Sequence, residues 1–175
     1  MVRHMIIETA IQQTEANFPA AKVLHLIDVE NLVGAAHFAV PQAKVVHAAY
    51  ERVAPCGSVN QTVIATSHHA ALPAWLTWPA TTRRLVRSGP DGADLALLGV
   101  LAHEAVAGRF QHVVIGSGDG IFALPAARLQ SAGCTVTVVT RRGALSRELR
   151  LAVRDVRYID PEPAVIVMPA MLRAA

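Results

Sequence analysis

The sequence predicts one doubly wound α/β domain, in which helices cover both faces of a parallel sheet. Segments with the pattern of strands alternate along the chain with segments that have the pattern of helices, as in proteins with a parallel sheet. The strand segments are nearly continuous runs of apolar residues rich in Val, which favours strands buried on both faces. With 175 residues, of which 53% are hydrophobic and 17% charged, the chain can bury a substantial core.

Six segments are expected to form the strands. The first, "KVLHLID", has an apolar body and ends at Asp28. The third, "TTRRLVRS", is rich in Arg and the sixth, "VRYI", is short, so these two carry the weakest strand pattern. The expected strands are residues 22–28, 58–66, 81–88, 112–117, 134–140 and 156–159.

Helical patterns fill the intervals between these strands. The longest, "DGADLALLGVLAHEAVAGRF", has apolar residues that recur every three and four positions. The helix after the fourth strand is expected to end at Gly133, because glycine is the usual residue just after a helix. The expected helices are residues 31–53 with a break near Pro41, residues 91–110, residues 119–133 and residues 144–153.

The domain is expected to occupy residues 22–160. Residues 1–21 form an N-terminal extension in which "ETAIQQTEANF" predicts a short helix. Residues 161–175 form an apolar, proline-broken tail that predicts packing on the body or self-association as a homodimer. The sequence has no secretory leader pattern and no run of about eighteen apolar residues, so a cytoplasmic protein with no membrane segment is expected. Two cysteines without CxxC spacing offer no zinc site.

Acidic residues follow three of the expected strands, at the sheet edge where open α/β proteins bind their ligands. Asp28 ends the first strand, Asp94 lies at the start of the long helix after the third, and Asp119 lies in a glycine-rich turn after the fourth. Converging carboxylates repel one another unless they share a cation, and Mg²⁺ or Mn²⁺ takes such oxygen ligands. A metal so held can activate water for attack on a phosphodiester. The acids therefore predict a metal site for phosphodiester hydrolysis.

Arginines accompany these acids in two local groups. The formal net charge is +3 and the isoelectric point is about 9.3, a mildly basic balance. Such groups can bind a nucleic-acid backbone, although a solvated basic surface explains the charge equally well. The residues expected to contact RNA are Arg87, Arg141, Arg142 and Ser117.

Each acid also has a purely structural interpretation. Asp28 and Asp119 are suited to cap helices, and a carboxylate at Asp94 suits the first turn of a helix. The turn "GSGDGI" also resembles part of a dinucleotide-binding loop, with Ile121 at the place of the third glycine. An acid inside that loop would repel the pyrophosphate, so a nucleotide- or phosphate-binding regulator is the weaker alternative.

Three segments resemble the NYN domains, the bacterial and eukaryotic branch of the PIN-like metal-dependent ribonucleases. They are "LIDVENL" at 26–32, "GADLALL" at 92–98 and "VVIGSGDGIFALPAARLQSAGCTVTVV" at 113–139. The resemblance extends from about Val23 to Tyr158 and implies a PIN-like three-layer α/β/α sandwich. It also implies an endoribonuclease that hydrolyses RNA with Mg²⁺ or Mn²⁺.

The same resemblance assigns roles to individual residues. Asp28 corresponds to the family's first-strand aspartate and Asn31 to the asparagine that commonly follows it. Asp94 corresponds to the acid of a "G-x-D" segment, and Asp119 to the first aspartate of an "SGD-x-D-F" turn. The resemblance therefore implies that Asp28, Asp94 and Asp119 bind the metal, and that Asn31 orients a ligand.

One position departs from the family pattern. The second acid of the glycine-rich turn corresponds to Ile121, which cannot bind a metal. Glu30, two residues after Asp28, is a candidate to supply the missing carboxylate. The alternative is a catalytically impaired NYN-like module that binds RNA or a protein partner without cleavage.

Overall fold

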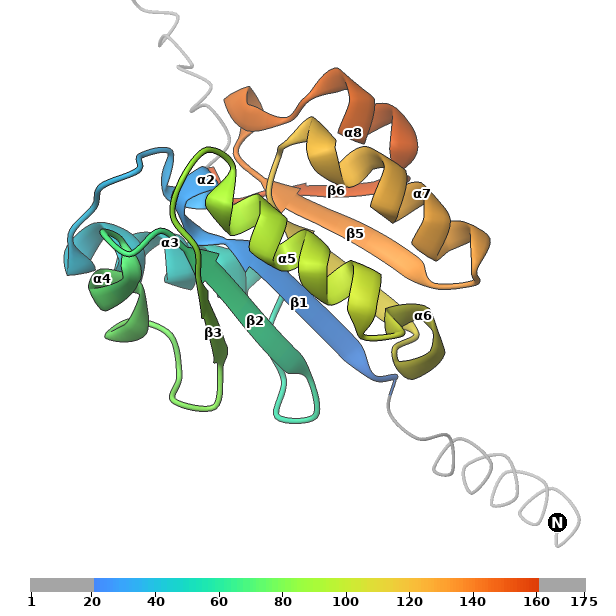
Figure 1. Cartoon of the computed structure of the whole chain (residues 1–175), viewed down its shortest axis with the longest axis horizontal. Coiled ribbons are helices and arrows are strands. Elements are labelled where there is room, and N and C mark those ends of the chain that lie inside the picture. The colour runs from blue at the N-terminus through green and yellow to red at the C-terminus, as the bar shows by residue number, and fades with distance from the viewer. Residues whose placement is uncertain (1–20, 161–175) are drawn as a thin grey trace, which may run out of the picture.

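A computed structural model describes residues 21–160 as a six-stranded sheet in which every strand pair is parallel (Figure 1). The strand order is β3-β2-β1-β4-β5-β6, so β1 and β4 lie at the centre and the connections run outward from them in both directions. This order creates a switch point between the carboxyl ends of β1 and β4. The strands are β1 (Val23–Asp28), β2 (Gln61–Thr66), β3 (Arg83–Val86), β4 (His112–Gly116), β5 (Thr135–Thr140) and β6 (Asp155–Tyr158).

Helices cover both faces of the sheet, which confirms the predicted α/β sandwich. One core cluster joins one face to α5 (Gly92–His103), α6 (Val106–Arg109), α7 (Ala123–Ser131) and α8 (Arg147–Ala152). A second cluster joins the other face to α2 (Val29–Val33), α3 (Val40–Val53) and α4 (Ala71–Trp75). None of the helices within residues 21–160 is long and apolar enough to span a membrane.

Alternation along β1 decides which face receives its terminal aspartate. Successive side chains of a strand point to opposite faces. Leu24 and Leu26 belong to the cluster that α5 and α7 cover, whereas Ile27 belongs to the cluster on the α3 side. Asp28 continues the row of Leu24 and Leu26, so its carboxylate lies on the α5 side of the sheet.

The expected helix at 91–110 is wrong in one respect, because the structure divides it into two helices. α5 ends at His103, and Ala105 adopts a left-handed conformation with φ of 47°. The change of direction turns Val106 and Phe110 into the core, where they are 2% and 8% exposed. The carboxylate of Glu104 holds the break by accepting hydrogen bonds from Arg83 (2.6 Å) and Arg109 (3.4 Å).

Other helix boundaries differ from the expected ones for local reasons. The expected break near Pro41 is confirmed as the interval between α2 and α3, and Pro41 itself lies in the first turn of α3, where its missing N–H needs no partner. α4 has no counterpart in the sequence prediction. Short 3₁₀ turns precede two helices: η1 (Gly120–Phe122) leads into α7, and η2 (Arg142–Ala144) comes before α8.

Two expectations concern segments outside the described residues. They are the short helix in the N-terminal extension, and the packing or homodimer role of the tail at residues 161–175.

Close packing fixes the glycine-rich turn after β4 against the loop after β5. A Cβ atom on Gly118 would lie 2.2 Å from the Ala144 carbonyl oxygen and 2.6 Å from the Thr140 hydroxyl. The Gly118 carbonyl also accepts a hydrogen bond of 2.8 Å from the Ser146 N–H. Glycine is therefore required at 118 by the backbone that faces it rather than by its own φ angle.

We expect Gly118→Ala to lower the free energy of unfolding by about 1–3 kcal/mol, because the new methyl group overlaps backbone that cannot move freely. Gly99→Ala is the matched control: a Cβ there meets nothing within 4 Å, and alanine favours the helix by up to about 1 kcal/mol. Urea unfolding of both variants measures the difference. Equal stability of the two variants would contradict the packing described for Gly118.

Candidate functional site

Asp28 and Asp94 form a buried carboxyl pair at the carboxyl edge of the sheet. Their side chains come from the end of β1 and the first turn of α5, and the residues are 4% and 8% exposed. Ala93 and Leu97 of α5 pack in the same cluster as Leu24 of β1, which holds the helix over the strand. The two carboxyl groups lie close enough to share a hydrogen bond when one of them carries a proton.

Burial changes the acidity of this pair. Loss of water raises the pKa of both carboxyl groups, and the pKa of Asp94 rises to about 8. The negative charge of Asp28 raises the pKa of Asp94 further, and Asp119 and Asp91 add to the effect. A backbone hydrogen bond from Asn31 opposes the rise for Asp28. In the metal-free protein the pair therefore retains a proton at neutral pH.

Asp119 lies near this pair but is held by its own turn. Its Oδ1 atom accepts a hydrogen bond of 2.9 Å from the Ile121 N–H, which caps η1. Within residues 21–160, no three His, Cys, Asp or Glu side chains are grouped closely enough to hold one metal ion. The structure thus joins Asp28 and Asp94, and Asp119 adds its charge without completing a three-acid group.

Ile121 shows what replaces the missing family acid. Its half-buried side chain packs against the core cluster beneath α5 and α7, and its N–H donates to the Asp119 carboxylate. Position 121 therefore contributes to the core instead of to a metal site.

Asn31 connects the ends of three strands. Its N–H donates to Asp28 Oδ1 (3.0 Å), and its side-chain oxygen accepts from the Gly118 N–H (3.0 Å). Its carbonyl oxygen accepts from Arg141 Nε (3.1 Å). Asn31 thus links the aspartate of β1 to the turn after β4 and to the loop after β5.

Arg141 is half-buried and packs inward. Besides its bond to Asn31, its guanidinium covers Gly34, where an added Cβ would lie 2.6 Å from Arg141 Cζ. Gly34 also has a φ of 82°, which favours glycine. The structure therefore gives Arg141 a bracing role, and its contact with RNA stays a prediction.

Glu30 is directed to the neighbouring strand. Its Oε1 atom accepts hydrogen bonds from the Ser67 N–H (3.2 Å) and the Ser67 hydroxyl (2.5 Å). Ser67 follows β2, which pairs with β1, so the bond ties two adjacent strand ends together. With Oε1 held in this way, the second carboxylate oxygen of Glu30 is the one that remains available to a ligand.

The remaining residues expected to contact RNA differ in accessibility. Arg87 is exposed, and its backbone lies against Gly92 at the start of α5. Arg142 is exposed, with its guanidinium carbon 4.8 Å from the centre of the Tyr158 ring. Ser117 is 0% exposed and its hydroxyl accepts from the Asp119 N–H, so its side chain holds the turn in this structure, and its contact with RNA stays a prediction.

The carboxyl pair fits a hard divalent cation. Asp94 Oδ1 is buried and has no hydrogen-bond partner among the described residues, which is uncommon for a buried polar atom. Mg²⁺ typically binds through one or two carboxylates and keeps several waters. Asp28 and Asp94 supply that number of ligands, and a cation would satisfy the unpaired oxygen.

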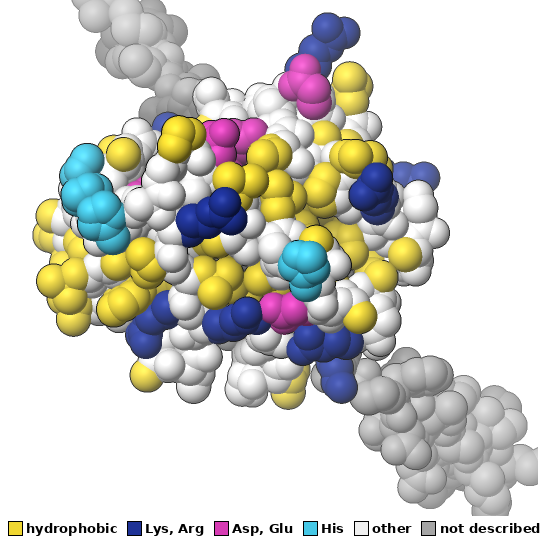
Figure 2. All heavy atoms as spheres, in the orientation of Figure 1, with side chains coloured by type: hydrophobic (Ala, Val, Ile, Leu, Met, Phe, Trp, Pro, Cys, Tyr) yellow, Lys and Arg dark blue, Asp and Glu magenta, His cyan; other side chains and the backbone are white. Residues whose placement is uncertain are grey.

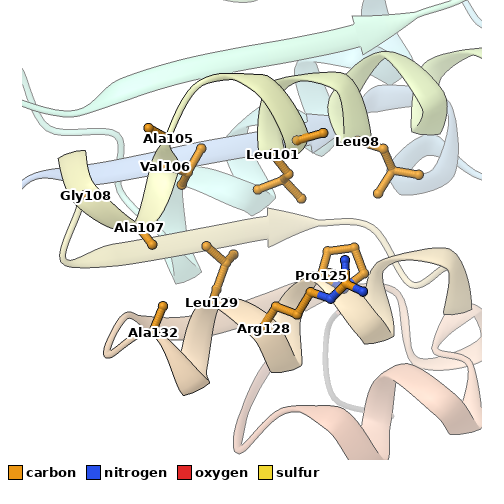
Figure 3. A pocket seen from close by; sticks show the side chains of 11 residues that line it. Leu98, Leu101, Ala105, Val106, Ala107, Gly108, Pro125, Arg128, Leu129 and Ala132 are labelled. Atoms are coloured by element: carbon orange, nitrogen blue, oxygen red, sulfur yellow. The ribbon is translucent and has the colours of Figure 1, made fainter.

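A groove elsewhere in the protein contains none of these residues. It is an apolar groove of about 480 Å³ between α5, α6 and α7, lined by the second half of α5 (Figure 3). Its walls carry no carboxylate and no histidine, so it lacks the chemistry of a hydrolytic site.

The raised pKa of Asp94 predicts how stability changes with pH in the metal-free protein. The pKa of Asp94 is about 8 in the folded chain and 3.8 for an unperturbed aspartate, so the folded chain binds more protons than the unfolded chain between these limits. The free energy of unfolding should therefore fall as pH rises from 5 to 8. We expect Asp94→Asn to reduce this fall and to be more stable than wild type at pH 8, by about 1–3 kcal/mol.

Melting temperatures in EDTA at pH 5, 6, 7 and 8 measure this effect. Glu148→Gln is the control, because Glu148 is exposed and is not among the charges that raise the pKa of Asp94. If the melting temperatures of wild type and Asp94→Asn changed equally with pH, this would contradict the buried carboxyl pair.

Comparison with known proteins identifies the family of the chain. Residues 22–160 match the NYN domain family. No curated protein matches the chain. Among solved structures, a protein of unknown function from Vibrio parahaemolyticus is similar, with 18% sequence identity, a TM-score of 0.48, and coverage of 80% of this chain and 93% of that chain. Because the family match covers most of the sequence, the chain belongs to the NYN domain family, a family of PIN-like nucleases.

Proposed function

We propose that the protein is a metal-dependent endoribonuclease that uses Mg²⁺ or Mn²⁺. The observation that carries this proposal is the buried pair of Asp28 and Asp94, with an unpaired carboxylate oxygen, at the switch point of a parallel sheet. Membership of the NYN family supports nuclease chemistry at this edge. Exposed arginines on both sides of the edge, Arg87 and Arg142, support a polyanionic substrate.

Each residue of the edge has a defined part in this proposal. Asp28 and Asp94 hold the cation, which when bound lowers the pKa of water and offsets the charge on the phosphodiester. Asp119 would add its negative charge near the cation without being one of its direct ligands. Asn31 positions Asp28 and the turn that carries Asp119. Arg87 and Arg142 bind the RNA backbone.

The alternative is an NYN module that binds RNA or a protein partner without cleavage. The observations that favour it are the apolar Ile121 at the place of a family acid and the lack of a three-acid group within residues 21–160. Under this alternative the carboxyl pair keeps its proton and serves only the fold.

We expect cleavage of single-stranded RNA in the presence of Mn²⁺, and none in EDTA. Asp94→Asn should lower the cleavage rate by about 100-fold or more, because it removes a direct ligand. Asp119→Asn should lower the cleavage rate by about 10- to 100-fold, as is typical of groups that lie near a metal site without binding the metal directly. The control variant Asp91→Asn should cleave at the wild-type rate. If it cleaved as slowly as Asp94→Asn, this would contradict the assigned roles.

Metal binding can be measured without activity. At a Mn²⁺ concentration about 100 times the dissociation constant, binding to the folded state adds about 2.7 kcal/mol, a rise of roughly 5–10 °C in Tm. Asp94→Asn should lose this rise. Absence of both the Tm rise and RNA cleavage would reject the metal site and support the non-cleaving module. A Tm rise without cleavage would keep the metal site and reject the nuclease activity.

A further inference from the structure

The groove between α5, α6 and α7 is suited to an apolar occupant. Leu98 and Leu101 of α5 face Pro125 and Leu129 of α7 across it (Figure 3). Arg128 is the one charged residue among those that line it. A volume of about 480 Å³ is within the range of ligand and peptide sites.

The sequence of α5 indicates that this groove is covered in the whole chain. A helix that is apolar on all sides is normally buried on all sides. Leu97 and Val100 are buried in the core, but Leu98 and Leu101 on the outer side are only half-buried. Figure 2 shows apolar side chains gathered on this face of the molecule. Within residues 21–160 no segment covers them.

We propose that residues 5–18 of the N-terminal segment fill this groove as an amphipathic helix. Ile7, Ile11, Thr14 and Phe18 recur at intervals of three and four, so a helix places them on one face. Helices that bind in grooves use anchors at this spacing. Acidic residues at 8 and 15 lie beside the stripe and complement the positive charge of Arg128, the charged residue of the groove lining.

The position of the first described residues supports this occupant. Lys22 donates to Gln111 Oε1 (2.7 Å) and accepts from the Gln111 N–H (3.1 Å), which places the start of β1 beside the segment after α6. Gly108 of α6 lines both the groove and the hollow that Lys22 borders. The N-terminal segment therefore joins the domain next to the groove.

Chain geometry also favours this segment over the C-terminal tail. Helices usually end at or before the residue that precedes a proline, so the proposed helix would end at Phe18 and residues 19–21 would connect it to β1. A 14-residue helix is about 21 Å long, close to the length of about 18 Å for α5. The tail begins beyond Asp160, whose carboxylate binds the Arg142 N–H at the opposite edge of the sheet.

The test compares two substitutions in the full-length chain. Ile11→Asp places a charge in the apolar stripe, and the matched control Gln12→Asp places the same charge outside it. We expect Ile11→Asp to lower Tm by about 3–8 °C and to speed amide exchange in residues 98–108 and 125–132. Gln12→Asp should change neither. Equal behaviour of the two variants overturns the proposal.

A double-mutant cycle shows whether the stripe contacts the groove. Ala102→Asp alters an exposed lining residue, so it leaves the core intact. Its effect on Tm should not add to that of Ile11→Asp, because either change alone releases the same helix. Leu151 is an apolar residue outside the groove and is 76% exposed. The effect of Leu151→Asp on Tm should add fully to that of Ile11→Asp. Full additivity in both cycles overturns the proposal.

Light scattering identifies the source of the occupant. A monomer whose mass is unchanged by Ile11→Asp supports docking within one chain. A dimer that Ile11→Asp dissociates shows that a second copy supplies the helix, which overturns the intramolecular arrangement. These measurements need no RNA, so they are independent of the proposed nuclease activity.

Discussion

The arrangement of this domain depends on the packing of α5 against β1, which presses two carboxyl groups together. Ala93 and Leu97 share one apolar cluster with Leu24 and Leu26, and burial of each large apolar side chain contributes about 1.5–3 kcal/mol. This packing outweighs the unfavourable burial of Asp94 beside its partner. The electrostatic penalty remains visible as the raised pKa of Asp94, and it is the physical property that makes the site receptive to a cation.

A small network holds the carboxyl edge around this pair. Asn31 links the ends of β1, β4 and β5, and Arg141 braces it from outside. Gly118 allows the two loops to touch, and Ser67 holds Glu30 on the other side. The edge is therefore braced before any ligand arrives, and preorganised groups of this kind lose little free energy on binding.

The sequence was sufficient for much of the fold, because apolar runs and helical periods are local patterns. It also located Asp28, Asp94 and Asp119 at one edge, since the strand ends of a parallel sheet share an edge. Contacts that depend on strand order could not be predicted: nothing in the spacing shows that Asn31 meets Gly118 or that Ser67 meets Glu30. The break at Ala105 was also hidden, because the apolar period continues through it.

Position 121 illustrates a competition between a metal site and a hydrophobic core for one side chain. A carboxylate there would add negative charge beside Asp119 and Asp94, whereas Ile121 adds apolar contacts to the cluster beneath α5 and α7. Stability and activity oppose each other at such a residue. The isoleucine favours stability, so the folding of this domain depends less on metal occupancy than it would with another acid at the same edge.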